Sequence, residues 1–236
     1  MLKEAIQYIN SLCSPYVQEL NGQTWSDKPL HRIHHNPKAE PITLSTLDGL
    51  CDYLSSDFDK RGNVFVHVES PTRVSVFSAL DDERSREMLV VANAEVPKFQ
   101  YDFFHDHEMF LINLQTAFLD AGDRALLLKF AGTVESGTIA QYGDDGVTQK
   151  ATVKTGVASK SDAIVPNPVT LRGYRTFAEV DQPDAQYVFR MREGGHCVQC
   201  ALFEADGDAW KIEAKRNILE YLENALIGID EITFLQ

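Results

Sequence analysis

The stretch NVFVHVESPTRVSVFSAL, residues 63–80, alternates apolar and polar side chains in two runs that meet at Ser70-Pro71. Because successive side chains of a β-strand point to opposite faces of its sheet, this alternation predicts half-buried strands over 63–70 and 72–80. EMLVVANAEV, residues 87–96, predicts a third strand. Strands that follow one another with no helix between them favour antiparallel pairing over a βαβ array.

Helical periodicity occurs on both sides of these strands. Apolar residues three or four positions apart predict helices over 2–13, 46–57, 106–119 and 208–226. The second helix follows Ser45, with Asp48 three residues on, which is typical of a helix N-terminus. Its buried stripe is predicted to be Leu47, Leu50, Cys51 and Leu54.

Further hairpins are predicted before and after this region. VQELNGQTW (17–25) contains Asn-Gly, the dipeptide favoured in two-residue hairpin turns. Residues 133–142 and 147–159 read as strands around a GDDG turn, and DAQYVFRM (184–191) pairs with CVQCALFEA (197–205).

These patterns together predict the fold class and the domains. The fold is α+β, mostly antiparallel β-sheet in sandwich-like hairpins, with N-terminal, central and C-terminal helices. Residues 1–44 are expected to form an appendage of helix, hairpin and loop, and residues 45–236 the main α+β domain.

Composition and charge limit the kinds of partner that are expected for this protein. The 236 residues are 44% hydrophobic and 24% charged, with a net charge of −13. Residues 1–44 hold four acidic and four basic residues, so the negative excess lies in the remainder. Such a field opposes direct association with nucleic acid or an anionic membrane, and we expect neither partner. The acidity serves solubility or, alternatively, contact with a basic protein partner.

No apolar run approaches the roughly 18 residues of a membrane-spanning helix. The first residues do not resemble a signal peptide, and four cysteines are too few for a disulfide framework. A cytoplasmic location is therefore expected.

The stretch GGHCVQC, residues 194–200, places His196 beside a Cys197–Cys200 pair. A structural zinc site needs four ligands, and this stretch supplies one C-x-x-C knuckle. Residues three apart on a strand also point to opposite faces, which favours a hairpin connection followed by a strand. A zinc site and a redox dithiol stay open as alternatives. The H-x-E of a zinc deaminase is present at 67–69, but His196 stands where that pattern has proline.

Two histidine-bearing stretches are further candidates for metal sites. His31, His34 and His35 lie in a predicted loop, where they would bind metal adventitiously or titrate near neutral pH. FHDHE (104–108) lacks the second histidine of an H-E-x-x-H motif and is interpreted as a helix start. No metal site and no cofactor are predicted.

A basic and aromatic cluster is the candidate ligand-binding site. RGYRTF (172–177) combines arginine with tyrosine, a pairing that clamps phosphate or stacks a base. The candidate residues are Arg172, Tyr174 and Arg175, with Arg190 and Arg192 on a nearby predicted strand. Ion pairing of these arginines within their own sheet is the alternative. Phosphate loops are absent, because Thr138 stands where the lysine of a G-x-x-x-x-G-K motif is required.

VPNPVTLRGYRTFAEVDQP (165–183), with GDDGVTQKATVKTGVAS before it and ALFEADGDAWKIEAKRNILEYL after it, resembles the YfdQ-like family of phage and prophage proteins. The resemblance covers roughly 45–226. It implies expression in the cytoplasm of a bacterial host and carries no catalytic residues.

The function expected is that of a non-enzymatic phage or prophage accessory protein, which acts by binding as a homo-oligomeric scaffold. The first alternative is a protein that sequesters a small anionic, nucleotide-like ligand in counter-defence. The second is an acidic partner of phage recombination or replication proteins. An unidentified hydrolase is disfavoured, because no nucleophile and base can be assembled from linear motifs.

Overall fold

The structure is a computed structural model that describes most of the chain. The residues described are 2–13, 15–29, 38–56, 58–132, 142–144, 149–155, 159–165, 167–194 and 198–236. The chain divides into two compact units, Met1–Ala39 and Glu40–Gln236, called here the N-terminal unit and the C-terminal unit. Within the described residues, no helix is long and apolar enough to cross a membrane.

The N-terminal unit consists of a helix and a hairpin. α1 spans Leu2–Cys13, and β1 (Val17–Leu20) pairs antiparallel with β2 (Gln23–Ser26). Asn21 and Gly22 both have positive φ, 55° and 73°, as a tight hairpin turn requires. The predicted helix, hairpin and turn are confirmed.

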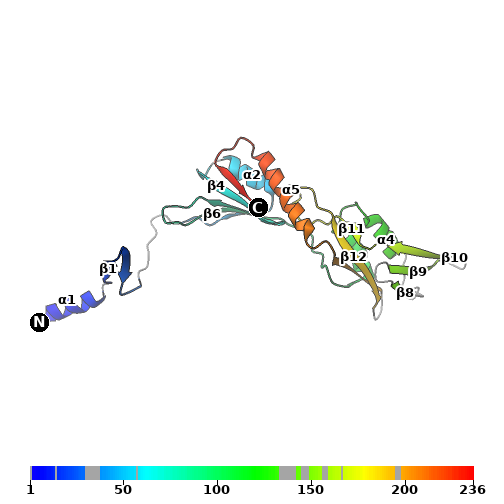
Figure 1. Ribbon diagram of the computed structural model, residues 1–236, viewed down its shortest axis with the longest axis horizontal. Coiled ribbons are helices and arrows are strands. Elements are labelled where there is room, and N and C mark those ends of the chain that lie inside the picture. Colours follow the sequence, from blue (N-terminus) through cyan, green and yellow to red (C-terminus); the bar gives the residue numbers. More distant parts are fainter. Residues whose placement is uncertain are drawn as a thin grey trace. The chain divides into compact units, whose positions relative to one another are not determined.

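The C-terminal unit contains a sheet whose described strands run in the order β14-β4-β5-β6-β3, and β4 and β6 of this sheet are labelled in Figure 1. Its strands are β3 (Ile42–Leu44), β4 (Val64–Ser70), β5 (Arg73–Ser78), β6 (Met88–Asn93) and β14 (Ile232–Leu235). β4, β5 and β6 pair antiparallel, which confirms the three strands predicted from alternation. The edge strands β14 and β3 are parallel to β4 and β6 and were not predicted.

The edge strand β3 also moves the expected domain boundary. Ile42 pairs with Val90 and Leu44 with Ala92, so these residues belong to the sheet. The C-terminal unit accordingly begins at Glu40, whereas the appendage expected from the sequence extended to residue 44. β3 has only three residues, and its partner strand is distant in sequence. The boundary therefore cannot be predicted from a local sequence pattern.

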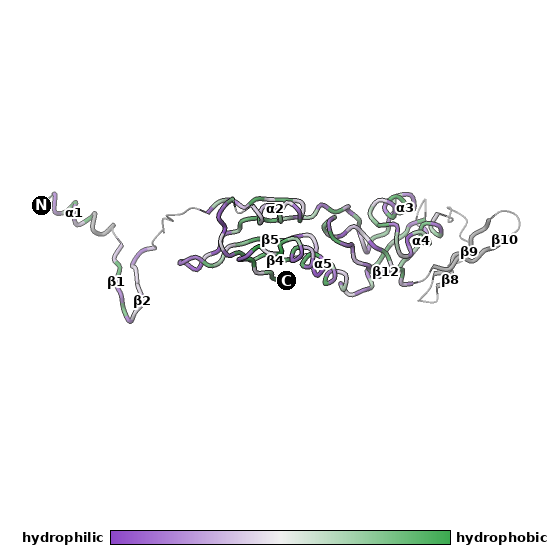
Figure 2. Tube along the Cα trace, turned by 90° about the horizontal axis from the view of Figure 1, so that it is seen from above, coloured by the Kyte–Doolittle hydropathy of each residue, from purple (hydrophilic) through white to green (hydrophobic). Residues whose placement is uncertain are grey.

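This sheet packs against α2 (Leu47–Ser56) and α5 (Ala209–Ala225). The predicted stripe of α2 is buried, and Figure 2 shows hydrophobic residues along β4 and β5. Core side chains from the sheet and from α5 include Val64, Val66, Val68, Val74, Val76, Ile218 and Leu222. Each such aliphatic side chain contributes about 1.5–3 kcal/mol relative to exposure.

A second sheet, antiparallel throughout, has the strand order β11-β12-β13-β7. Its strands are β7 (His105–Asp106), β11 (Val169–Leu171), β12 (Ala185–Glu193) and β13 (Val198–Glu204). The pairing of β12 with β13 confirms the predicted hairpin. Alternate residues of β12, including Tyr187 and Phe189, are buried with Phe110 of α3 (His107–Thr116) and Leu127 of α4 (Arg124–Gly132).

A third sheet, also antiparallel, has the order β10-β9-β8. Its strands are β8 (Tyr142–Asp144), β9 (Gln149–Thr155) and β10 (Ser159–Val165). β9 confirms part of the strand predicted over 147–159, whereas β10 was not predicted as a separate strand. β8 shares only Tyr142 with the strand predicted over 133–142 and includes Gly143 and Asp144 of the predicted GDDG turn. The other two residues of that turn lie outside the described residues. Most of the strand predicted over 133–142 also lies outside them.

α5 joins the two main cores of the C-terminal unit. Trp210 and Ala214 in its first half pack in the core of the second sheet. Ile218 and Leu222, further along the same face, pack in the core of the first sheet. The predicted α+β class, with mostly antiparallel sheet and N-terminal, central and C-terminal helices, is thus confirmed.

Candidate functional site

The predicted cluster RGYRTF lies after β11 and is held by backbone hydrogen bonds. Leu119 N–H donates to the Arg172 carbonyl oxygen at 2.8 Å, and Tyr174 N–H donates to the Ala117 carbonyl oxygen at 2.9 Å. On the other side, the buried Gln182 Oε1 accepts from Arg175 N–H at 2.8 Å. Contacts distant in sequence therefore fix the backbone that carries the candidate side chains.

The five candidate residues do not converge on one pocket. Arg172 forms a two-pronged ion pair with Asp184, with Nε–Oδ1 and Nη2–Oδ2 distances of 2.9 and 3.1 Å. The hydrogen bonds from Arg172 and the charge of Asp184 raise the pKa of Arg172. Both side chains are part-exposed, at 38% and 49%, so this pair resembles an ordinary surface ion pair.

Arg190 and Arg192 on β12 are held within their own part of the sheet. Arg190 Nη1 donates to the Phe189 carbonyl oxygen at 3.1 Å. Arg192 Nε donates to Gln199 Oε1 at 2.9 Å, and its guanidinium lies 4.0 Å from the centre of the Phe104 ring. Both of these partners of Arg192 are neutral, whereas the ion pairing that the sequence left open is formed by Arg172 with Asp184 and by Arg175 with Glu204.

Tyr174 and Arg175 do share a cavity, called here the aromatic cavity. Its volume is about 200 Å³. The residues that line it are Thr72, Val96, Pro97, Phe99, Tyr101, Ala117, Tyr174, Arg175 and Trp210. Tyr174 keeps 41% of its surface exposed, whereas Trp210 keeps 6%. The cavity thus has a buried tryptophan, two partly buried aromatic residues, and a tyrosine that solvent reaches.

Among the described residues that line this cavity, Arg175 is the only one with a formal charge, and its guanidinium contacts two aromatic rings. Its guanidinium carbon lies 3.5 Å from the centre of the Trp210 ring and 4.3 Å from that of Tyr101. Its Nη1 donates to Tyr187 Oη at 3.0 Å, and its Nη2 pairs with Glu204 Oε1 at 2.5 Å. The cation is therefore oriented by four neighbours before any ligand arrives.

Electrostatics keep these groups in fixed protonation states. Burial disfavours the charged form of Arg175, but the neighbouring Tyr101, Tyr187 and Glu204 together raise its pKa. Burial raises the pKa of both Tyr101 and Tyr187, so the phenols are protonated at neutral pH. Neither tyrosine is placed to act as a base there.

Sequence reasoning missed the aromatic wall of the cavity. Phe99 and Tyr101 lie in a segment without regular structure between β6 and β7, and their rings meet edge to face at 4.7 Å. Four aromatic residues close together in KFQYDFF (98–104) were the available signal. Trp210 falls in the helix predicted over 208–226, and no sequence pattern linked it to RGYRTF.

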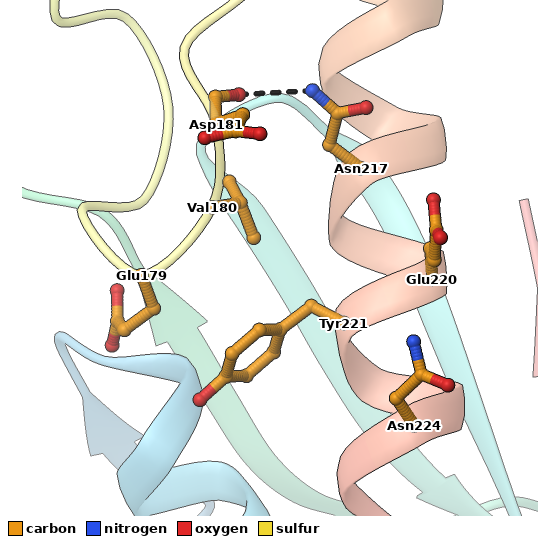
Figure 3. Close-up of a pocket in the computed structure, with 7 residues that line it drawn as sticks. All are labelled: Glu179, Val180, Asp181, Asn217, Glu220, Tyr221 and Asn224. Carbon is orange, nitrogen blue, oxygen red and sulfur yellow. Dashed lines mark hydrogen bonds between the residues drawn. The ribbon is translucent and has the colours of Figure 1, made fainter.

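A polar cavity of about 290 Å³ lies along α5 (Figure 3). The residues that line it are Glu179, Val180, Asp181, Asn217, Glu220, Tyr221 and Asn224. Several of its polar groups serve the fold. Glu179 Oε1 accepts from Leu47 N–H at the start of α2, and Asn217 Nδ2 donates to the Asp181 carbonyl oxygen at 2.9 Å. Tyr221 donates to Asp48, which raises the pKa of Tyr221.

The structure places the remaining sequence candidates as follows. His105 and His107 each bond a backbone carbonyl, those of Gln100 and Ala131, at 2.8 and 2.6 Å. Cys200 is buried in β13, while His196, Cys197 and the three loop histidines lie outside the described residues. No group of three or more metal-ligating side chains occurs within the described part of the chain.

Burial and nearby carboxylates raise the pKa of Cys51 to about 11, so its thiol is a poor nucleophile at neutral pH.

Comparison with known proteins identifies no relative of this chain. No protein-family model, no curated protein and no solved structure matches the chain. The resemblance to the YfdQ-like family stays a prediction.

Proposed function

We propose that the protein acts by binding, and that its aromatic cavity takes the planar ring of a small molecule such as a nucleoside. The observation that carries this proposal is the convergence of Phe99, Tyr101, Tyr174 and Trp210 around a cavity of about 200 Å³ with Arg175 stacked in it. Aromatic walls favour flat, apolar ligands, which they contact over a large area with little loss of side-chain entropy.

The charge balance favours an uncharged ring over a phosphate. Arg175 is already paired with Glu204, and Arg172 with Asp184. An anion would have to compete with these carboxylates, and it would meet a chain of net charge −13. We therefore expect a nucleoside to bind more tightly than the nucleotide-like ligand considered from the sequence, and both are tested.

Tryptophan fluorescence tests the ligand directly, because the chain has two tryptophans. In a Trp25→Phe background, Trp210 reports alone on the cavity. Adenosine and guanosine are expected to quench it saturably, and the corresponding monophosphates to bind more weakly. Tyr174→Ala should weaken binding by about tenfold, since loss of one stacking ring costs about 1–3 kcal/mol.

A matched control for this experiment is Tyr16→Ala, which removes an exposed tyrosine of the N-terminal unit. Its affinity should equal that of the parent protein. Lack of saturable quenching with every compound of the panel would overturn the proposed ligand class. Tighter binding of the monophosphates would instead favour the anionic ligand.

We also propose that the protein is a homo-oligomer assembled through its N-terminal unit. The apolar residues Leu2, Ile6 and Ile9 of α1, and Trp25 of β2, are exposed. A helix of twelve residues and a two-stranded hairpin are each marginal in water without further packing. The N-terminal unit is also close to neutral, so its copies can meet without the repulsion that the acidic C-terminal units exert.

Self-association is tested by charging the apolar stripe of α1 in the full chain. Ile6→Glu with Ile9→Glu is expected to convert the oligomer to a monomer, because burying two carboxylates at an apolar interface costs far more than association gains. Sedimentation velocity gives the mass. Gln7→Glu adds a charge beside the stripe and should leave the oligomer intact. A monomeric parent protein would contradict the proposal.

The biological setting rests on the family resemblance. A phage or prophage accessory role, including contact with a basic recombination or replication protein, accords with the net charge of −13. Retention of such a partner on the immobilised protein at low salt, and its release at high salt, would support that role.

A further inference from the structure

Gln182 is a buried polar side chain in residues 172–184, which join β11 to β12 and are called here the β11–β12 connection. It keeps 8% of its surface exposed. Its Oε1 accepts from Arg175 N–H at 2.8 Å and from Thr176 N–H at 3.1 Å. Its Nε2 donates to the Phe177 carbonyl oxygen at 2.8 Å. One amide thus acts as both acceptor and donor for the backbone of a single bend.

These hydrogen bonds take the place of those that regular secondary structure would supply. Residues 174–180 of the connection belong to no helix or strand. Backbone groups there need side-chain partners, because a buried unpaired group costs about as much as a lost hydrogen bond. Among the described residues, Gln182 is the only acceptor for the N–H groups of Arg175 and Thr176. The shape of the bend therefore depends on this one amide.

The bend is also attached to two other parts of the C-terminal unit. Tyr174 N–H donates to the carbonyl oxygen of Ala117, the residue that follows α3, at 2.9 Å. Thr176 Oγ1 donates to the carbonyl oxygen of Pro71, in the turn between β4 and β5, at 2.5 Å. The bend that Gln182 holds is thus bonded to both of these neighbours.

Two residues of this bend line the aromatic cavity. Tyr174 and Arg175 are among its lining residues, whereas Gln182 is not. The guanidinium carbon of Arg175 lies 3.5 Å from the centre of the Trp210 ring. A long arginine side chain has many rotamers, so a fixed backbone limits the positions that its guanidinium can reach.

We infer that Gln182 is the positioning residue of the aromatic cavity. Its amide fixes the bend, and the bend sets the places of Tyr174 and Arg175 before a ligand arrives. Such preorganisation raises affinity, because the protein then loses less conformational freedom when the ligand binds. The inference rests on the proposed binding of a planar ring in this cavity, and it adds a residue that acts without touching the ring.

The test compares adenosine binding by the parent protein and by Gln182→Met, both in the Trp25→Phe background, through the fluorescence of Trp210. Methionine is similar in length to glutamine but lacks both hydrogen-bonding groups of the amide. Gln182→Met should weaken adenosine binding by about tenfold, because the bend must then become ordered on binding. In ¹H–¹⁵N NMR spectra of the ligand-free protein, the amide proton signals of Arg175 and Thr176 should move upfield, since both protons lose their acceptor.

Asn167→Leu is the matched control, because Asn167 is a second amide side chain that bonds the backbone with both of its ends. Its Oδ1 accepts from Phe189 N–H at 2.9 Å, and its Nδ2 donates to the Phe189 carbonyl oxygen at 3.3 Å. Asn167 is not among the residues that line the aromatic cavity. Its replacement removes the same kind of hydrogen bonds and should change adenosine affinity by less than about twofold.

Gln182→Glu is the conservative variant. A protonated carboxyl group offers one acceptor and one donor, as the amide does, whereas a carboxylate can only accept and would face the Phe177 carbonyl oxygen. The dissociation constant of Gln182→Glu, divided by that of the parent, should therefore fall as the pH is lowered from about 8 to about 5, since burial favours the protonated form. The ratio cancels pH effects that both proteins share, such as protonation of His105, whose ring stacks on that of Phe99.

The possible failures of the two proposals can be told apart. Equal adenosine affinity of Gln182→Met and the parent would overturn the inference and leave the proposed ring binding intact. An equal loss in Asn167→Leu would also overturn it, because reduced stability alone would then explain the weaker binding. If Gln182→Met does not fold, Gln182→Glu carries the test, and a ratio that stays constant with pH contradicts the inference. If the parent shows no saturable quenching, the proposed function fails, and the inference fails with it.

Discussion

Replacing Arg175 with alanine is expected to lower the free energy of unfolding by about 3 kcal/mol, at the lower end of the range for breaking a buried ion pair. The side chain of Arg175 is 13% exposed and that of its partner Glu204 28%, so Glu204 would lose its cation while still partly shielded from water. The hydrogen bond to Tyr187 and the stacking on Trp210 would be lost with it. Urea denaturation followed by circular dichroism measures the change.

Arg172→Ala is the matched control, because it removes the same side chain three positions earlier. Its ion pair with Asp184 is 38% and 49% exposed, and such pairs contribute about 0–1 kcal/mol. Equal losses in the two variants would mean that Arg175 is not the organising cation of the aromatic cavity. A stable Arg175→Ala protein with weakened nucleoside binding would instead assign the residue to ligand contact alone.

Replacing Gly122 with alanine is expected to destabilise the C-terminal unit by about 3 kcal/mol. Gly122 has φ +57°, and an added Cβ would lie 2.4 Å from the Thr170 carbonyl oxygen. The left-handed backbone costs a non-glycine residue about 1–2 kcal/mol, and forced movement of a packed backbone about 1–3 kcal/mol more. The same turn is joined to β11 by Asp123, whose Oδ2 accepts from Thr170 N–H at 2.8 Å and whose N–H donates to Thr170 O at 2.9 Å.

Gly228→Ala separates the two causes of this loss. Gly228 also has positive φ, +83°, but nothing lies within 4 Å of an added Cβ. Only the backbone cost is expected there, about 1 kcal/mol. Thermal and urea unfolding should therefore show that the Gly122→Ala protein is clearly less stable than the Gly228→Ala protein. Similar losses would show that β11 yields easily to the added methyl group.

Sequence reasoning succeeded for the site only where its residues are close together in the chain. Tyr174 and Arg175 were recognised from RGYRTF, and both line the aromatic cavity. Arg190 and Arg192 were grouped with them because their strand was expected to be near, but β12 holds them by local partners. The ring of Phe99 and the carboxylate of Glu204 could not be assigned to the site, since only folding brings them to Arg175.

By itself, the sequence determined the elements that repeat a local period. Alternation gave β4 and β5, the 3.6-residue period gave α2 and α5, and Asn21-Gly22 gave the hairpin turn, because each depends on neighbours along the chain. Tertiary structure alone decided the short edge strands β3 and β14, whose few residues are held by partners distant in sequence. It also decided which arginine became a buried cation. Burial and charge pairing are set by contacts through space, and no linear pattern records them.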